Sequence, residues 1–288
     1  MRLIEETKCE IQLPEESLRN IEFRTATIVL PRYLGSGRCY KAYAVLPDYV
    51  NVTSVSALRS NTLNDYLDNL YKWKVKDPEM WLSPVAKLLI DSFVLSDQAK
   101  KFLIARQAFM ADNGEIHVFS PLFLITTYLF YFVNDALYKS MKRTRFHGTY
   151  LGAFGVVVLS FAVTYTNFFL FRYIYVNQLS KDADAKAITR GRYDSKEFEE
   201  ARKRGEKLPV DPHYYEGAME FYSKEIQRNR ALRLLTKKTA GWFKDSSRQF
   251  SDEGDYRSSI FAVGPFPSQR IRDIVSWKLG SERIGDRK

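Results

Sequence analysis

Two long uncharged segments near the middle of the chain constrain its fold more than any other feature. Residues 116–134 provide 19 consecutive positions, and residues 148–171 provide 24, without Asp, Glu, Lys or Arg. At about 1.5 Å per helical residue they reach about 28 and 36 Å, against a hydrocarbon core of about 30 Å. They predict a transmembrane helical hairpin, because burying two such aromatic-rich helices in a soluble protein would require a much larger chain.

The connection between the two segments is basic. Residues 135–147 carry Lys139, Lys142, Arg143 and Arg145 against one Asp. Loops on the cytoplasmic or matrix side of membrane proteins have an excess of Lys and Arg. We therefore expect this loop on that side of the membrane and the flanking segments on the opposite side. Basic residues just outside the hairpin make this charge bias small.

The hairpin divides the chain into three parts. We expect a soluble segment at 1–115, the hairpin at 116–171 and a second soluble segment at 172–288 that packs with the first. The chain has 44 Lys and Arg against 34 Asp and Glu. No basic stripe interleaved with aromatic residues and no nucleic-acid motif accompanies this excess, so we expect no nucleic-acid partner. Basic flanks of apolar segments are typical of membrane proteins instead.

The N-terminal region and the cysteines exclude several classes. Residues 1–16 contain five Glu and no apolar core, so we expect no secretory signal in them. Cys9 and Cys39 belong to neither a CxxC motif nor a Cys/His cluster. The sequence thus predicts two buried free thiols rather than a disulfide framework or a structural zinc site, although pairing of the two stays open.

The first soluble segment has the residue types of short strands. Strands are predicted at Thr25–Leu30, Tyr40–Leu46 and Asn51–Ala57, with turns at Pro31 and at Gly35–Gly37. The glycine pair at 35 and 37 lacks the rest of a phosphate-binding fingerprint, so a plain turn is favoured.

Helices are predicted in both soluble segments. Ser83 before Pro84 and Ser96 before Asp97 are typical helix N-termini, and Asn113 with Gly114 ends the second of these helices. After the hairpin we expect a solvated helix or linker, an amphipathic helix and a short final helix, at residues 181–210, 214–235 and within 260–279. The fold class expected is α+β, with a mixed, mainly helical soluble body.

Several short stretches occur in a recognisable order. Gly37–Lys41, Trp81–Pro84, Leu95–Phe102, Glu220–Tyr222 and Ala231–Arg233 resemble the transmembrane protein 177 family, on both sides of a matching hairpin. The resemblance covers residues 35–280. It implies a multi-pass protein of the mitochondrial inner membrane, implicated in biogenesis of cytochrome c oxidase subunit II through a small membrane chaperone of that subunit. Family members begin with a further apolar segment, for which residues 1–16 offer no counterpart.

A more distant similarity concerns HtpX-type membrane metalloproteases. They carry an HExxH helix before a transmembrane hairpin, a third ligand on a helix after it, and a late element that Gly264 and the pair Arg270–Ile271 resemble here. In this register Arg106 and Met110 replace the two His, and Gln107 replaces the Glu. Arg cannot ligate zinc at neutral pH and Gln cannot act as a base. The resemblance therefore implies an inactive metalloprotease fold, and the alternative is an ordinary helix with a chance register.

These observations favour a non-enzymatic membrane assembly or stabilising factor. We expect no catalytic, cofactor-binding or metal-binding residue, and we expect the lipid bilayer, cytochrome c oxidase subunit II and its small chaperone as partners. If the fold is that of a metalloprotease, the buried Arg106 requires an acidic partner, and Glu216 and Glu220 are the nearest candidates in this register. The alternative function is a membrane-embedded metal-dependent protease with unrecognised ligands.

Overall fold

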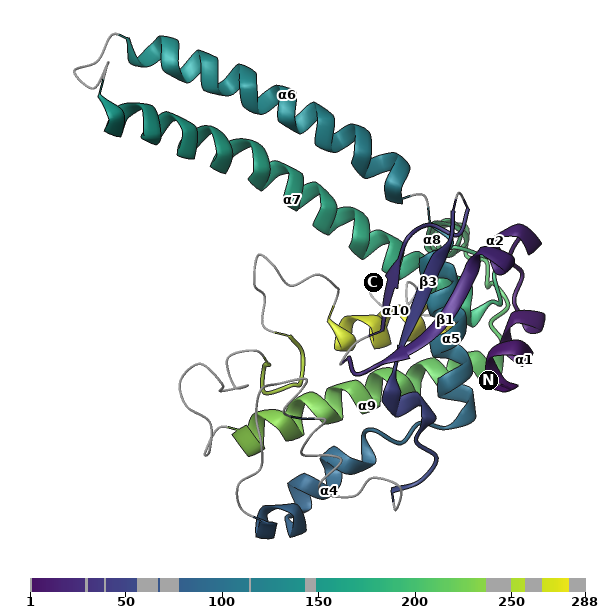
Figure 1. The fold of residues 1–288 in the computed structure, drawn as a ribbon. Coiled ribbons are helices and arrows are strands. Elements are labelled where there is room, and N and C mark those ends of the chain that lie inside the picture. The colour runs from purple at the N-terminus through teal and green to yellow at the C-terminus, as the bar shows by residue number, and fades with distance from the viewer. Residues whose placement is uncertain are drawn as a thin grey trace, which may run out of the picture. The chain divides into compact units, whose positions relative to one another are not determined.

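The structure is a computed structural model that describes residues 2–28, 31–38, 40–55, 67, 78–113, 115–142, 149–236, 250–256 and 266–279. Its elements are α1 (Arg2–Glu10), α2 (Glu15–Asn20), β1 (Ile21–Ala26), β2 (Arg32–Leu34), β3 (Ala42–Pro47), η1 (Asp48–Asn51), η3 (Pro78–Leu82), α4 (Pro84–Asp91), α5 (Asp97–Ala111), α6 (Glu115–Met141), α7 (Tyr150–Ile188), α8 (Ser195–Lys203), α9 (Pro212–Thr236) and α10 (Pro267–Leu279). The described chain is mainly helical with one small sheet, which is compatible with the α+β class (Figure 1).

Contacts between residues divide the chain into two compact units. The first combines Met1–Asn113 with Leu179–Lys288, and the second is Gly114–Gln178. We refer to them as the body and the hairpin. Helix α7 begins in the hairpin and ends in the body.

The sheet of the body has the strand order β1-β3-β2, with β1 parallel and β2 antiparallel to β3. Alternate residues of β3 face the core, so Ala42, Ala44 and Leu46 are buried while Tyr43 and Val45 are only partly covered. This is the period-two pattern of a sheet with one packed face and one open face. Helix α5 packs against β2 and β3.

The predicted strands are partly wrong. Only the second, Tyr40–Leu46, coincides with an observed strand, β3. Strand β1 begins at Ile21 and so overlaps only the start of the first predicted strand, whose last two residues, 29 and 30, lie outside the described ones. The start at Ile21 was missed because Glu22 and Arg24, which lie on the open face, interrupt the apolar run. The third prediction, Asn51–Ala57, falls on the end of the 3-10 helix η1, on irregular chain at 52–54 and on Val55, which has 3-10 geometry. Its last two residues lie outside the described ones.

Helix α9 lies at the centre of the body, where α4, α5 and α10 all pack against it (Figure 1). The expected N-caps are confirmed: Ser83 accepts a hydrogen bond from the Ala86 amide, and Ser96 accepts one from the Ala99 amide, each at 3.2 Å. These bonds satisfy amides that the first turn of a helix leaves free. Helices α9 and α10 match the two helices predicted after the hairpin.

The hairpin packs through aromatic rings. Phe119 of α6 meets Phe168, Phe171 and Tyr175 of α7, with ring centroids 6.2, 6.4 and 5.1 Å away in edge-to-face geometry. Each such pair adds about 0.5–1.5 kcal/mol beyond the area it buries. The two helices therefore hold together mainly through aromatic side chains, and the Arg172 guanidinium of α7 also lies 6.0 Å from the ring centroid of Phe119.

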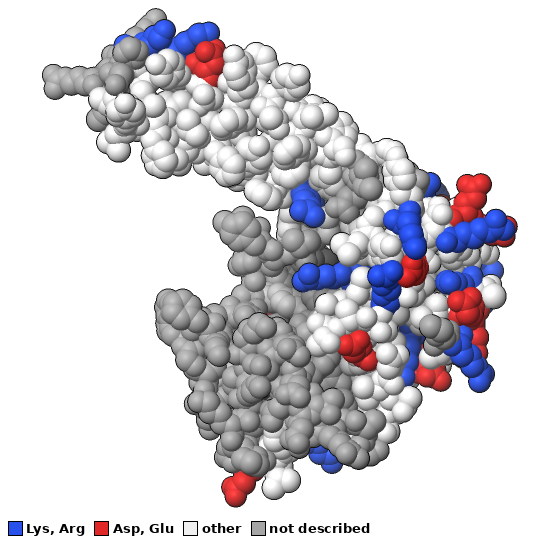
Figure 2. Space-filling view, viewed as in Figure 1, with Lys and Arg blue, Asp and Glu red and all other residues white. Residues whose placement is uncertain are grey.

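Most of the hairpin's apolar surface is not covered by the chain itself. Tyr128 is 68% exposed and Leu151 is 73% exposed, and the face of the hairpin seen in Figure 2 has almost no charged side chains between its ends. By length and composition, 117–141 and 150–188 are helices that could each cross a membrane. A soluble protein rarely exposes an apolar surface of this extent.

Both helices continue beyond the predicted spans. Helix α6 includes residues 135–141, which the sequence places in a loop, and within them Lys139 Nζ pairs with Asp135 Oδ2 one turn earlier at 2.7 Å. Residues 181–188, predicted as solvated, form the end of α7, where Asp184 and Ile188 are fully buried. Part of the core therefore lies in a stretch whose charged residues had indicated a solvated segment.

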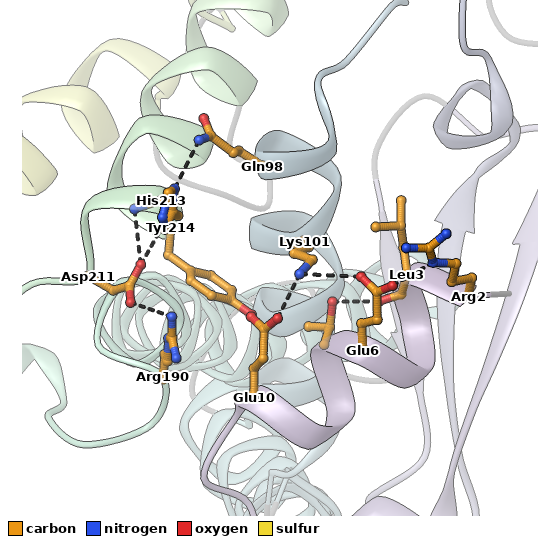
Figure 3. Close-up of polar contacts among 11 residues, drawn as sticks. Arg2, Leu3, Glu6, Glu10, Gln98, Lys101, Arg190, Asp211, His213 and Tyr214 are labelled. Carbon is orange, nitrogen blue, oxygen red and sulfur yellow. Dashed lines mark hydrogen bonds and ion pairs between the residues drawn. The ribbon is translucent and has the colours of Figure 1, made fainter.

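The unpredicted helix α1 is fixed to α5 and α9 by a polar network (Figure 3). Lys101 Nζ of α5 pairs with Glu10 Oε1 at 2.6 Å and with Glu6 Oε2 at 3.4 Å. The Tyr214 hydroxyl donates to Glu10 Oε2 at 2.8 Å. Cys9 lies on the outer face of α1 and is exposed, so the prediction of a buried thiol is wrong there, and Cys39 lies outside the described residues.

The pH dependence of this network has a definite sign. Burial alone would raise the pKa of Glu10, but the hydrogen bonds from Lys101 and Tyr214 and the charges of Lys101 and Arg190 lower it below its ordinary value. A carboxylate with a lowered pKa stabilises the fold above its unfolded pKa of about 4.3, and this stability is lost as the pH falls through the folded pKa.

We therefore expect α1 to loosen below about pH 4. A nitroxide on Cys9, with Cys39 replaced by Ser, should show a mobile spectrum in acid and an immobile one at neutral pH. Glu10→Gln should show the mobile spectrum at neutral pH as well, since its amide keeps the shape without the charge. An immobile label in the Glu10→Gln protein at neutral pH would contradict this account.

Candidate functional site

Arg106 lies near the middle of α5, and its side chain is only 12% exposed. Its Nε donates to Asp184 Oδ1 and its Nη2 donates to Ser180 Oγ, both at 2.6 Å. Ser180 and Asp184 lie one turn apart on α7, so one face of that helix supplies both acceptors. The guanidinium thus has a charged and a neutral partner on the same helix.

Asp184 is the acceptor that the surrounding helices share. It is fully buried, and besides Arg106 it receives the Tyr222 hydroxyl at 2.8 Å to Oδ1 and 2.9 Å to Oδ2. Arg270 Nη1 lies 3.2 Å from Asp184 Oδ2, and Arg270 is 1% exposed. One carboxylate therefore joins α5, α7, α9 and α10. We call Arg106, Asp184, Tyr222 and Arg270 the buried ionic cluster.

A second pair of charges lies on α9 next to this cluster. Glu225 and Arg228 are 4% and 1% exposed. Burial raises the pKa of Glu225, and the charges of Arg228 and Arg106 oppose that rise. The Arg228 guanidinium lies 4.7 Å from the ring centroid of Tyr49 and 5.3 Å from that of Phe93. The aromatic faces thus help to solvate a buried cation.

The protonation states in the cluster are firmly held. Burial disfavours the charged form of Arg106, but Tyr222, Asp184 and Glu225 outweigh it and raise the pKa of Arg106 further above its ordinary value. Burial also raises the pKa of Tyr222 strongly, with Asp184 adding to the rise. Both groups therefore keep their protons at physiological pH and act as hydrogen-bond donors.

Gln107 and Met110 both contribute to the packing of the body. With its amide oriented to suit its neighbours, Gln107 accepts from Arg106 Nη1 at 2.9 Å and donates to the Arg32 carbonyl at 3.3 Å, joining α5 to β2. Met110 is 6% exposed and belongs to the apolar core. Gly264, the fourth position singled out by the distant resemblance, lies outside the described residues.

The acidic partner of Arg106 was predicted wrongly. Glu216 is exposed, and Glu220 accepts from the amide of Ser96 at 2.9 Å and from the Ser96 hydroxyl, at the start of α5. Arg106 lies about 15 Å further along α5 at the helical rise of about 1.5 Å per residue, beyond the reach of Glu220. Helix α5 packs against α9, and α10 brings Arg270 to the cluster.

Asp184 is the residue that sequence reasoning missed. It stands between alanines, in the run Ala183–Ala187, where Lys186 and the preceding Lys181 and Asp182 suggest a solvated segment. The usable signal is helical phase: Ser180, Asp184 and Ile188 fall on one face, whose last member is apolar. An acidic residue on the apolar face of a helix requires a buried cation.

The chemistry available to this cluster is that of a fixed crosslink. Asp184 accepts from Arg106 and Tyr222 and pairs with Arg270, and the cluster presents Arg and Tyr where a metal site requires His, Cys or carboxylates. Among the residues the structure describes, no group of three or more His, Cys, Asp or Glu is placed to hold a metal ion. Comparison of the chain with family models, with curated proteins and with solved structures gives no significant match.

Proposed function

We propose that the chain is a non-enzymatic assembly factor of the mitochondrial inner membrane, anchored by the hairpin and acting on cytochrome c oxidase subunit II together with its small membrane chaperone. The location and the partners rest on the ordered stretches that resemble the transmembrane protein 177 family. The anchoring is supported by one observation above all: two long helices expose apolar side chains that the chain does not cover.

The body supports a binding role over catalysis. The positions that would carry zinc and its catalytic base in an HtpX-type protease here carry Arg106, Gln107 and Met110, and each has a structural partner or a core position. Arg106 is joined to Asp184 by an ion pair where a metalloprotease would join its helices through zinc. In this proposal the fold is retained and the reaction is lost.

Small and hydroxyl residues on α7 suit helix–helix contacts. Within the hairpin, Ser160 and Thr164 are buried, and their hydroxyls donate to carbonyls one turn earlier at 2.7 Å. A Cβ added at Gly155 would meet nothing within 4 Å. Small residues let helix backbones approach closely inside a bilayer. Ser160 and Thr164 are already covered within the hairpin, so we expect a helix of the partner at the open side of α7 that carries Gly155.

The proposal predicts two results in mitochondria. The protein should resist carbonate extraction, because two uncharged helices are held by the bilayer.

In cells from which the protein has been removed, the amount of subunit II should fall several-fold, and expression of the native chain should restore it. Gln107→Ala should restore it too, since no water is activated at this position, although loss of two hydrogen bonds should cost about 1–3 kcal/mol of stability.

The controls separate the parts of the proposal. Recovery of the protein in the soluble carbonate fraction would remove the anchoring. Purification with tagged protein should co-isolate subunit II and its chaperone, and failure to do so with the protein membrane-bound would remove the partners alone. A folded Gln107→Ala protein that binds subunit II but does not restore it would point back to the metal-dependent protease.

A further inference from the structure

The connection between β2 and β3 places apolar and basic side chains together in solvent. Leu34 is 63% exposed and Tyr40 is 65% exposed. The Arg38 and Lys41 side chains beside them are 59% and 62% exposed. We call Leu34, Arg38, Tyr40 and Lys41 the turn surface. It combines an amphipathic ring and an aliphatic chain with two cations, which is the composition of protein segments at a membrane–water interface.

The turn surface is fixed to the end of α5. The Gly37 amide donates to the Ala111 carbonyl at 2.8 Å, and the Ser36 hydroxyl donates to the Asn113 carbonyl. Asn20 Nδ2 donates to the Gly37 carbonyl at 3.0 Å and holds the turn from the other side. The turn therefore has a set position within the body.

The residue that anchors the turn is next to the apolar chain. Only Gly114 separates Asn113 from Glu115, where α6 begins. A chain extends at most about 3.6 Å per residue, so about 7 Å of chain joins the anchored Asn113 to the first residue of that helix. If α6 enters a bilayer, as proposed above, the turn must lie close to the bilayer surface.

The charge of this part of the body suits an anionic surface. The three strands and the turn contain Arg24, Arg32, Arg38 and Lys41 against a single carboxylate, Glu22. Glu22 pairs with Arg24 and with Lys41 at 2.8 Å. The one other carboxylate that pairs with these cations in the described chain is Asp112, 3.4 Å from Arg38. Basic side chains lie over the sheet in Figure 2, with acidic ones among them.

We propose that the turn surface is a contact for anionic phospholipids. Tyr40 and Leu34 enter the headgroup region, while Arg38 and Lys41 meet lipid phosphates. Basic residues near an anionic leaflet are attracted over a distance of about one Debye length, so a cation held at the surface by a short tether gains this attraction in full. The contact rests on the proposed membrane anchoring and goes beyond it, because it assigns a lipid class and a surface of the body.

Quenching by nitroxide lipid tests the contact in the full chain. The protein carries Cys9→Ser and Cys39→Ser, with a bimane label on Tyr40→Cys or, for comparison, on Leu82→Cys. It is reconstituted in phosphatidylcholine vesicles with or without phosphatidylserine. We expect strong quenching at residue 40 when phosphatidylserine is present, weaker quenching without it, and weak quenching at residue 82, which is 86% exposed.

A matched pair of charge reversals isolates the role of the cations. Lys41 pairs with Glu22 at 2.8 Å, and Arg204 pairs with Glu206 at 3.0 Å, both as exposed ion pairs. Lys41→Glu should lower the equilibrium constant for contact between the turn surface and the anionic bilayer by at least about fivefold. This is the factor that one basic residue contributes at an anionic surface. Arg204→Glu should leave the constant unchanged, and added salt should weaken the contact.

The outcomes distinguish this inference from the anchoring on which it depends. Quenching at residue 40 that is no greater than at residue 82, or that ignores phosphatidylserine or Lys41→Glu, overturns the lipid contact while the protein still resists carbonate. Extraction of the protein by carbonate overturns the anchoring itself.

Discussion

Asp184→Ala is expected to destabilise the body more than any other single change in the buried ionic cluster. It removes the partner of Arg106 at 2.6 Å and of Arg270 at 3.2 Å, and it leaves the Tyr222 hydroxyl without its acceptor. Removing one side of a buried ion pair costs about 3–5 kcal/mol, because the other charge stays in the interior. At about 2–4 °C per kcal/mol for a unit of this size, Tm in detergent should fall by about 6–20 °C.

Two further variants make the result interpretable. Glu15→Ala breaks an ion pair of the same 2.6 Å length whose side chains are 75% and 79% exposed, and it should change stability by less than about 1 kcal/mol. Replacing Arg106, Asp184 and Arg270 together by Met, Leu and Leu should recover much of the loss, since an apolar core tolerates the removal of a whole ionic group. An Asp184→Ala protein with unchanged Tm would show that the cluster does not hold the helices together.

Gly217→Ala is expected to separate α5 from α9. A Cβ at position 217 would lie 2.3 Å from the Gln98 carbonyl oxygen, 2.6 Å from its carbon and 3.0 Å from the Ala99 amide nitrogen. These are backbone atoms of the first turn of α5, so no rotamer change relieves the clash. Overpacking costs about 1–3 kcal/mol and more where backbone must move, which exceeds the gain of about 1 kcal/mol that Ala brings to a helix.

The measurable result is a lower Tm together with loss of the cap at Ser96. Glu220 holds Ser96 beside this contact, so amides at the start of α5 should lose protection from hydrogen exchange. Gly155→Ala is the matched control, because Gly155 also lies within a helix and has nothing within 4 Å of the added Cβ. If Gly217→Ala behaved like Gly155→Ala, the close approach of α5 and α9 would be wrong.

Local signals in the sequence located most helices correctly. Ser83 and Ser96 have hydroxyls that a helix N-terminus requires, and both are caps in the structure. The uncharged segments became the long helices α6 and α7, and the amphipathic pattern after residue 214 became α9. In each case the deciding interaction lies within a few residues along the chain, which is why it could be predicted.

Nonlocal pairings were the failures. The strand at Ile21–Ala26 exists because it pairs with Ala42–Pro47 across a connection that contains another strand. Asp184 looks solvated in the sequence, because its partners Arg106 and Arg270 lie far from it, one before it and one after it along the chain. Helix α1 has one apolar face, but its attachment to α5 and α9 depends on Lys101 and Tyr214. A single sequence contains these residues and not the distances between them.

The interruption of the body by the hairpin has a consequence for how the protein is made. Met1–Asn113 cannot complete its core until Leu179 and the residues after it have been synthesised. At about 5–20 residues per second, α10 follows α5 by on the order of ten seconds. For the first part of that interval Arg106 lacks Asp184, and the apolar faces of α5 wait longer for α9. The nascent chain therefore passes through a long stage in which its uncovered apolar surface is available to a holding chaperone, before its last helix completes the fold.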